Sequence, residues 1–426
     1  RAPFVIYADF EALTEPIEQA ARDPHSPESY TDAYQTHTPC GYCIHIVCSA
    51  GASHSKSQTY KPICYRGKDT IPKFIQEMHK LEESIMNDLK EVEPMVMTAQ
   101  DVKEHGAATK CCLCNEPLNG DVIREHCHLT GTYRGAAHSQ CNLKEGNKRT
   151  RRYKIPVFFH NLKGYDSHLI ISEVGKYTDN LQAIPQNYEK MISFSYGHLR
   201  YLDSFAFLSS SLDAQVENLY EKGKGKDKFV HSARHCSHRQ HLDLMLKKGV
   251  YPYDYMSRWD RMDETELPPK EAFFSKLSDS GIEDEQYAHA QEVWQSFGCK
   301  TLGDYHDLYM KSDVLLLADV FENFRDVCME SYDLDPAHYF TTPNFAWDAM
   351  LKKTGVKLEL LQDYDMHLMV EQGLRGGIAM ISHRHAEANN PYLKDGYDES
   401  KERSYIAYLD ANNLYGWAMS QPLPKG

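Results

Sequence analysis

Asp9 and Glu11 are the first residues whose types and spacing could do chemistry. They follow an apolar run, Phe4 to Tyr7, whose residue types predict a buried strand. Side chains alternate along a strand, so both carboxylates point to one face. Adjacent carboxylates repel, and a divalent metal ion is the usual counter-charge. The alternative is a strand end open to solvent, where acids are common.

Two more acids stand where a metal site would need them. Asp166 follows a predicted strand, residues 155–160, and a turn, and it opens a predicted helix. Asp313 lies four residues after Tyr309, so both can point the same way from one helix. With the first pair, these acids are expected to hold two Mg²⁺ or Mn²⁺ ions about 3.5–4 Å apart, which activate a water and stabilise the leaving oxygen of a phosphodiester. The Tyr309 hydroxyl would orient that water, although any one acid taken alone is more often a cap or a surface charge.

Cysteine spacing predicts a second metal site. Cys111 and Cys114 form one close pair, and His138 and Cys141 form another. Two such pairs supply the ligands of a tetrahedral structural Zn²⁺. Twelve cysteines in 426 residues are too few for a disulfide-rich fold, and their clustering suits a reducing, intracellular compartment.

The elements that must position these residues alternate between strands and helices. Apolar steps of three and four residues predict helices over 70–92 and 308–325, and strand-like runs include 41–47, 201–205 and 405–410. A segment rich in Gly, Cys and His, 105–150, lacks this periodicity, so we interpret it as an insertion in an α/β fold.

Composition limits the class of protein. The formal net charge of −14 argues against a protein that only coats nucleic acid, but it allows an enzyme with a local basic track. Basic residues gather at 144–154 and 222–248, either as solvated loops or as DNA contacts. No apolar run approaches the ~18 residues of a membrane span. The chain opens without Met or a signal peptide and stops abruptly, so we interpret it as a fragment at both ends.

Three of these patterns resemble, in order, the exonuclease motifs of proofreading DNA polymerases. They are Asp9-x-Glu11, Asn161-x3-Tyr165-Asp166 and Tyr309-x3-Asp313. The resemblance implies that the acids hold the catalytic metal ions and that Asn161 and Tyr165 bind the terminal nucleotides, the tyrosine by stacking. Ala12 stands where protein-primed enzymes often have Thr, so one contact to the primer terminus is lost.

Two shorter patterns resemble DNA-binding motifs of the same exonucleases. Ser211-Leu212 resembles a Ser/Thr-Leu motif that grips single-stranded DNA, although Gln215 replaces a hydrophobic residue. Lys248-x2-Tyr251 resembles a motif whose lysine holds a phosphate oxygen near the metal ions. The alternative for Ser211 is a helix N-cap.

The C-terminal region resembles the start of a family B polymerase palm. Residues Asp410 to Gly416 resemble its first motif, with Asn413 for Ser and Gly416 for Pro. By this resemblance Asp410 holds catalytic Mg²⁺, while Asn413 and Leu414 seat the triphosphate. Tyr415 would exclude a ribose 2′-OH, or it is a core aromatic at a strand end.

A linker motif and the order of the motifs indicate which branch of the family B polymerases the sequence resembles. Leu374 to Gly377 resembles the Tyr-x-Gly-Gly linker, with Leu374 for Tyr, so Arg375, Gly376 and Gly377 are expected to contact DNA. The whole set is similar to protein-primed family B polymerases, in particular those of Polinton/Maverick DNA transposons. The second palm aspartate motif does not appear, so the fragment is expected to excise nucleotides but not to polymerise.

The insertion is similar to the phage recombination endonuclease VII family, a ββα-metal (HNH-like) nuclease. By that match His126 would be the general base, and Glu125 and Asn142 would bind Mg²⁺. Glu125 replaces the usual Asp and His138 the usual Cys; a longer acid moves the metal by about a bond length, which matters to catalysis. The alternative is a structural zinc knuckle that touches DNA.

Together these features imply an RNase H-like 3′→5′ exonuclease domain with an inserted ββα-metal zinc module, followed by the start of a palm. The expected bounds are 1–104 and 151–330 for the exonuclease, 105–150 for the insert and 331–426 for the linker and truncated palm. The implied partners are primer–template DNA, a single-stranded 3′ end, dNTPs for the full-length protein and a terminal-protein primer, with no membrane; a nuclear location is compatible with them. The competing interpretations are a junction-resolving endonuclease on a degenerate exonuclease fold and a non-catalytic DNA-binding module.

Overall fold

The computed structural model describes residues 1–17, 35–49, 60–144, 153–177, 180–222, 225–236, 238–247, 249–276, 278–374, 380, 383, 385–393 and 395–422. It divides into two compact units, Arg1–Val356 and Lys357–Gly426. The first unit extends through α11 (Thr342–Thr354), beyond the predicted boundary at residue 330.

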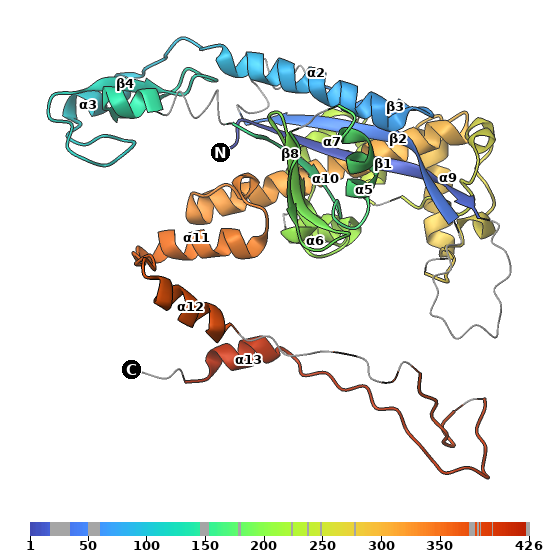
Figure 1. Ribbon diagram of the computed structural model, residues 1–426. Coiled ribbons are helices and arrows are strands. Elements are labelled where there is room, and N and C mark those ends of the chain that lie inside the picture. The colour runs from blue at the N-terminus through green and yellow to red at the C-terminus, as the bar shows by residue number, and fades with distance from the viewer. Residues whose placement is uncertain are drawn as a thin grey trace. The chain divides into compact units, whose positions relative to one another are not determined.

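A seven-stranded mixed sheet lies at the centre of the first unit, in the order β3-β2-β1-β6-β9-β8-β7 (Figure 1). The strands are β1 (Phe4–Pro16), β2 (Gln35–Cys48), β3 (Ile63–Arg66), β6 (Ile155–Phe159), β7 (Gln182–Pro185), β8 (Met191–Tyr196) and β9 (Leu199–Asp203). β6 pairs in parallel with β1 and β9, and the other neighbours are antiparallel. The predicted α/β class is therefore confirmed as a mixed α/β architecture.

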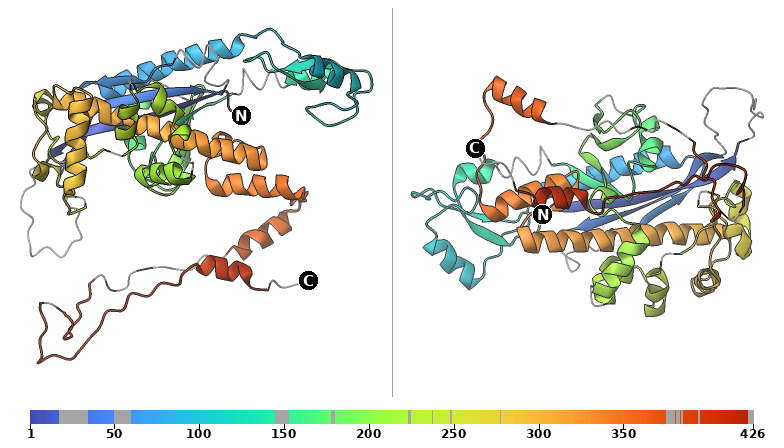
Figure 2. Two further views of the ribbon diagram at one scale, coloured as in Figure 1. Left: turned by 180° about the vertical axis from the view of Figure 1, so that it is seen from behind. Right: turned by 90° about the horizontal axis from the view of Figure 1, so that it is seen from below.

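Different helices cover the two faces of the sheet. They include α2 (Thr70–Lys90) and α5 (Asp166–Val174) on one face and α10 (Leu302–Tyr332) on the other. Figure 1 shows α2 above the sheet and α10 below it, and Figure 2 shows the same layers from behind. Ile6 packs in the α2 layer, whereas Val5 and Tyr7 pack in the α10 layer. Because side chains alternate, Asp9 and Glu11 share the face that α10 covers.

α10 extends the helix predicted over 308–325 at both ends. At its start, Thr301 Oγ1 accepts from the Asp304 N–H at 3.2 Å, and the Asp304 carboxylate accepts from the Thr301 N–H at 3.0 Å. At its end, Asp333 adopts a left-handed conformation with φ 51°. This capping box and C-cap set the length of the helix more than its apolar periodicity does.

The remaining helices of the first unit outside the insert follow β9 in the chain. They are η1 (Ser204–Ala206), α6 (Leu212–Lys222), η2 (Lys226–Lys228), α7 (Val230–Arg234), α8 (Arg239–Met245), η3 (Trp259–Asp263), η4 (Lys270–Phe273), α9 (Asp284–Ser296) and η5 (Pro336–His338). Within the described part of the chain, no helix combines the length and apolar character needed to cross a membrane.

The cysteine-rich insert has its own small fold. It comprises α3 (Ala99–Ala107), the antiparallel pair β4 (Ile123–His126) and β5 (Tyr133–Ala137), and a helical turn at 139–144. Its buried apolar cluster is small and includes Leu118, Ala136 and Ala137. Leu129 is instead buried in the main cluster of the α2 layer, which anchors the insert to the sheet domain.

The second unit has little regular structure. It contains α12 (Tyr364–Gly373) and α13 (Leu414–Ser420), and its described residues make a single strand-like bridge, Asn389 with Ser404. The strand predicted over 405–410 is wrong for this unit, where these residues are exposed and irregular. A strand needs a neighbour for its backbone hydrogen bonds, and the described residues of this unit supply none.

Candidate functional site

The register between β1 and β6 brings Asp166 to Asp9. Tyr7 lies opposite Phe158, so β6 ends level with the residue that precedes Asp9. The chain then turns through residues 160–165 and starts α5 at Asp166. Two acids that are far apart in sequence thus meet at one edge of a parallel strand pair.

Asp203 holds that turn in place. Its carboxylate accepts hydrogen bonds from the backbone N–H groups of Asn161 (2.9 Å), Lys163 (3.1 Å) and Phe205 (3.0 Å). Asn161 adopts φ 69°, a left-handed conformation that Asn tolerates better than most side chains. Asp203 was not predicted as a site residue, because a single acid at the end of a strand matches no sequence motif.

One pocket of about 420 Å³ collects most of the predicted exonuclease residues. Its wall contains Asp9, Glu11, Asn161, Tyr165, Asp166, Leu212 and Asp313. These residues come from β1, the turn after β6, α5, α6 and α10, so only the tertiary fold brings them together.

One oxygen of Asp166 is left unsatisfied by the described residues around this pocket. The side chain is 2% exposed, and burial, together with the charge of Asp9, raises its pKa well above the usual range. Among the described residues, none donates a hydrogen bond to Asp166 Oδ1. A buried carboxylate oxygen in this state, beside other carboxylates, fits a divalent cation that would satisfy the oxygen and offset the charge.

A histidine not predicted from the sequence contacts Tyr165. His37, on β2, lines the pocket, and its Nδ1 lies 2.8 Å from the Tyr165 hydroxyl. Burial raises the pKa of Tyr165, and the charges of Glu11 and Asp166 raise it further, so the hydroxyl stays protonated. The bond to His37 fixes the ring expected to stack on a terminal base.

A second tyrosine stands beside Tyr309. The hydroxyl oxygens of Tyr253 and Tyr309 are 2.9 Å apart, and Tyr253 lines the pocket together with Asp313. Burial raises the pKa values of both tyrosines well above the usual range, and the charges of Asp313 and Glu11 act in the same direction. Both hydroxyls therefore keep their protons. Tyr253 could have been noticed from its position two residues after Tyr251, which is the last residue of the predicted Lys-x2-Tyr pattern.

Replacing Tyr253 by Phe should slow the hydrolysis of single-stranded DNA expected of this pocket, without unfolding the protein. The change removes one hydrogen bond, for which ~1 kcal/mol corresponds to about a fivefold lower rate. Tyr309→Phe should have a similar effect, and the double variant should be little slower than either single one, because both changes break the same pair. Turnover of a labelled single-stranded DNA measures all three; fully multiplicative losses would contradict a shared role.

Ser211 caps a helix. Its Oγ accepts from the Ala214 N–H at 3.3 Å in the first turn of α6, in keeping with the N-cap alternative. Leu212, the next residue, does line the 420 Å³ pocket. The unexpected Gln215 donates from Nε2 to two carbonyls of the preceding loop. Lys248 lies outside the described residues.

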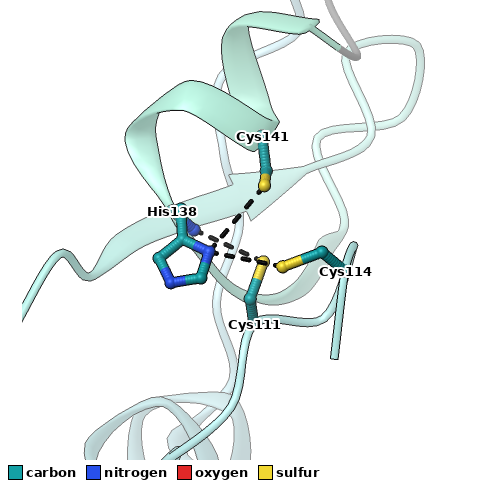
Figure 3. Close-up of side chains that lie close together, drawn as sticks. All are labelled: Cys111, Cys114, His138 and Cys141. Atoms are coloured by element: carbon teal, nitrogen blue, oxygen red, sulfur yellow. Dashed lines mark hydrogen bonds between the residues drawn. The ribbon is translucent and has the colours of Figure 1, made fainter. Parts of the chain in front are cut away.

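The insert brings its four predicted zinc ligands together. Figure 3 shows Cys111, Cys114, His138 and Cys141 pointing toward one another. Their ligand atoms all lie within 4.8 Å of one another, with His138 Nδ1 at 3.4 Å from Cys114 Sγ and 3.8 Å from Cys141 Sγ. This donor set is compatible with tetrahedral Zn²⁺.

The backbone prepares Cys111 to bind a metal. Burial alone would raise the pKa of its thiol, but the N–H groups of His138, Cys114 and Leu113 donate to the sulfur and lower it to about 6. The N–H groups of Leu113 and His138 each lie 3.4 Å from Cys111 Sγ. The thiolate favoured in this way is the form that binds a metal.

The residues predicted to bind Mg²⁺ in the insert are placed differently. Glu125 is 2% exposed, and Arg134 donates to both of its carboxylate oxygens, from Nε at 2.5 Å and from Nη2. This bidentate pair occupies the oxygens that a metal ion would need. Among the described residues nothing bonds to His126 Nε2, and its ring lies 5.0 Å from that of His128. Asn142 lies in the helical turn that carries Cys141.

The predicted palm residues lie in the second unit. Asn413 adopts φ 52° and immediately precedes α13, which begins at Leu414. Tyr415 is 85% exposed, so it is not a core aromatic of this unit, and Asp410 is exposed as well. Three linker residues that were predicted to contact DNA lie outside the described part of the chain: Arg375, Gly376 and Gly377.

No protein-family model, curated protein sequence or solved structure matches the chain. Its function is therefore inferred from the residues that the fold brings together.

Proposed function

We propose that this chain is a metal-dependent 3′→5′ exonuclease for single-stranded DNA ends, within a protein-primed family B DNA polymerase. The observation that carries the proposal is the pocket wall, to which the four predicted metal-binding acids contribute together with a fifth acid, Asp254. In this wall Asp166 Oδ1 is buried and receives no hydrogen bond from any described residue. A structural ion pair would instead place a basic group on Asp166 Oδ1, and no described residue does so.

The sheet supports an RNase H-like exonuclease fold. Three antiparallel strands, β3-β2-β1, are continued by the parallel strands β6 and β9, as expected of that fold. Asp9 and Glu11 lie on the central strand β1, Asp166 lies at the start of α5, and Asp313 lies on α10. The order of the exonuclease, linker and palm motifs supports the polymerase assignment, in which dNTPs, primer–template DNA and a terminal protein would be partners.

The pocket residues would have different roles in the proposed hydrolysis. When bound at the four carboxylates, two Mg²⁺ or Mn²⁺ ions supply an activated water and stabilise the leaving oxygen. The carboxylates are more widely spaced than the zinc ligands of the insert, so their side chains would turn inward to hold ions. The hydroxyl pair of Tyr253 and Tyr309 would orient the water, while Asn161 and Tyr165 would hold the terminal nucleotide against the acids.

An assay of mononucleotide release tests this function directly. With 5′-labelled single-stranded DNA and Mg²⁺, Asp9→Ala should lower release by roughly 10³-fold, because it removes a metal ligand worth several kcal/mol. Glu173→Gln, which changes a half-buried acid paired with Lys176 at the other end of α5, is the matched control and should have no effect.

The same set of variants separates the competing functions. A junction-resolving endonuclease predicts that His126→Ala abolishes cutting of branched DNA and that Asp9→Ala leaves it intact. A non-catalytic module predicts binding of primer–template DNA with no Mg²⁺-dependent mononucleotide release. Either pattern would overturn the exonuclease proposal.

A further inference from the structure

A second pocket, of about 430 Å³, lies between the insert and the sheet domain. The insert contributes Cys127, His128 and Leu129 to its wall, and the sheet domain contributes Lys154 and Arg200. The burial of Leu129 in the main apolar cluster holds the two walls together.

Two cations of this pocket form no ion pair with any described residue. Lys154 donates to the Gly197 carbonyl at 2.6 Å, and the Arg200 guanidinium lies 5.3 Å from the centre of the Phe340 ring. Burial lowers the pKa of both cations, and Arg200 lowers that of Lys154 further, more strongly than Glu82 raises it. In a chain of net charge −14, two partly buried cations in this state favour an anionic ligand.

The other charged groups of the wall are largely engaged elsewhere. Arg134 is paired with Glu125, and Asp88 accepts from the Tyr60 hydroxyl at 2.6 Å. Glu91 also lines the pocket. Arg1, which also lines the pocket, is paired with Glu322 and Asp326. Lys154 and Arg200 therefore remain as cations of the wall without an ion pair among the described residues.

We propose that this pocket binds the phosphates of a single-stranded nucleic acid through Lys154 and Arg200, with the strand lying against the His128 wall that the insert contributes. The volume far exceeds one phosphate, and apolar groups such as Leu89 and Leu129 lie beside the cations, where sugars and bases would pack. Basic grooves with apolar or aromatic neighbours are the usual way to hold single strands. The cationic pair is independent of the proposed exonuclease activity; only the identity of the anion rests on it.

Binding and its salt dependence test the proposal. Fluorescence anisotropy with a labelled single-stranded oligonucleotide, in buffer with Ca²⁺ in place of Mg²⁺, should show at least roughly tenfold weaker binding for the double variant Lys154→Gln, Arg200→Gln. The slope of log affinity against log salt should fall by about 1.4, since each single-strand phosphate contact contributes ~0.7. The charge-preserving variants Lys154→Arg and Arg200→Lys should bind like the wild type. So should Lys176→Gln, which removes an exposed lysine paired with Glu173.

Two outcomes would overturn the proposal. One is an unchanged affinity and salt slope in the double variant. The other is calorimetric binding of inorganic phosphate that the variant loses while it still binds the oligonucleotide normally, which would make this a free-phosphate site. If the double glutamine variant does not fold, Lys154→Met keeps the apolar stem, removes one of the two charges and should lower the salt slope by about 0.7. None of these readouts depends on mononucleotide release, so failure of the exonuclease assay is distinguishable.

Discussion

Replacing Asp166 by Asn is expected to abolish Mg²⁺-dependent mononucleotide release while making the metal-free protein more stable. The rate should fall by roughly 10³-fold, because one ligand of the proposed metal pair is lost. Stability should rise because the folded protein holds a carboxylate whose pKa is raised by burial and by Asp9. Such a group binds its proton more tightly in the folded state than in the unfolded state.

The sign of this effect sets its pH dependence. Without metal, the stability of the wild type should fall as the pH rises from the unfolded pKa of about 4 toward the higher folded pKa of Asp166. The amide of the Asp166→Asn variant cannot ionise, so that variant loses this part of the pH dependence. At neutral pH its unfolding midpoint should lie above that of the wild type, by roughly 1–2 °C for each kcal/mol of repulsion relieved.

Thermal unfolding with and without Mg²⁺ measures this expectation. Mg²⁺ should raise the midpoint of the wild type through binding to the folded state, and should raise that of Asp166→Asn much less. Glu173→Gln should respond to Mg²⁺ like the wild type. A variant that is less stable than the wild type at neutral pH, or that still degrades DNA, would show that Asp166 has a structural role instead.

Replacing Cys114 by Ser is expected to remove zinc from the insert and unfold it. The insert buries only a small apolar cluster, which includes Leu118, Ala136 and Ala137, so we expect its fold to depend on the metal. In small zinc domains, binding supplies ~10–16 kcal/mol of folding free energy. Loss of one ligand should therefore unfold residues 109–144, while the sheet domain, with its separate core, stays folded.

Zinc content and hydrogen exchange measure this outcome. The wild type should carry about one zinc ion per chain by elemental analysis, as expected of a four-ligand site. Cys114→Ser should carry almost none and should exchange its insert amides rapidly. Cys112→Ser is the matched control, because this adjacent cysteine lies outside the ligand group. Uniform exchange across the whole chain on loss of zinc would contradict a separate zinc-dependent module.

The helices and the zinc-ligand pairs could be predicted from the sequence because they depend on local spacing. Apolar steps of three and four residues located α2 and α10, although caps at Thr301 and Asp333 lengthened α10 beyond its apolar stripe. The pairs Cys111–Cys114 and His138–Cys141 converge as predicted. The strand over 405–410 failed, because pairing depends on a neighbouring strand that spacing does not reveal.

The sequence by itself determined which side chains share a direction within one element: two acids on one face of β1, and a tyrosine and an acid one turn apart on α10. Only the tertiary structure decided which helix covers that face, and that His37 and Tyr253 join the pocket while Ser211 caps a helix. Side-chain direction follows from the local backbone repeat. The meeting of β1, α5 and α10 follows from sheet register and from the burial of apolar faces between distant segments, which no local pattern encodes.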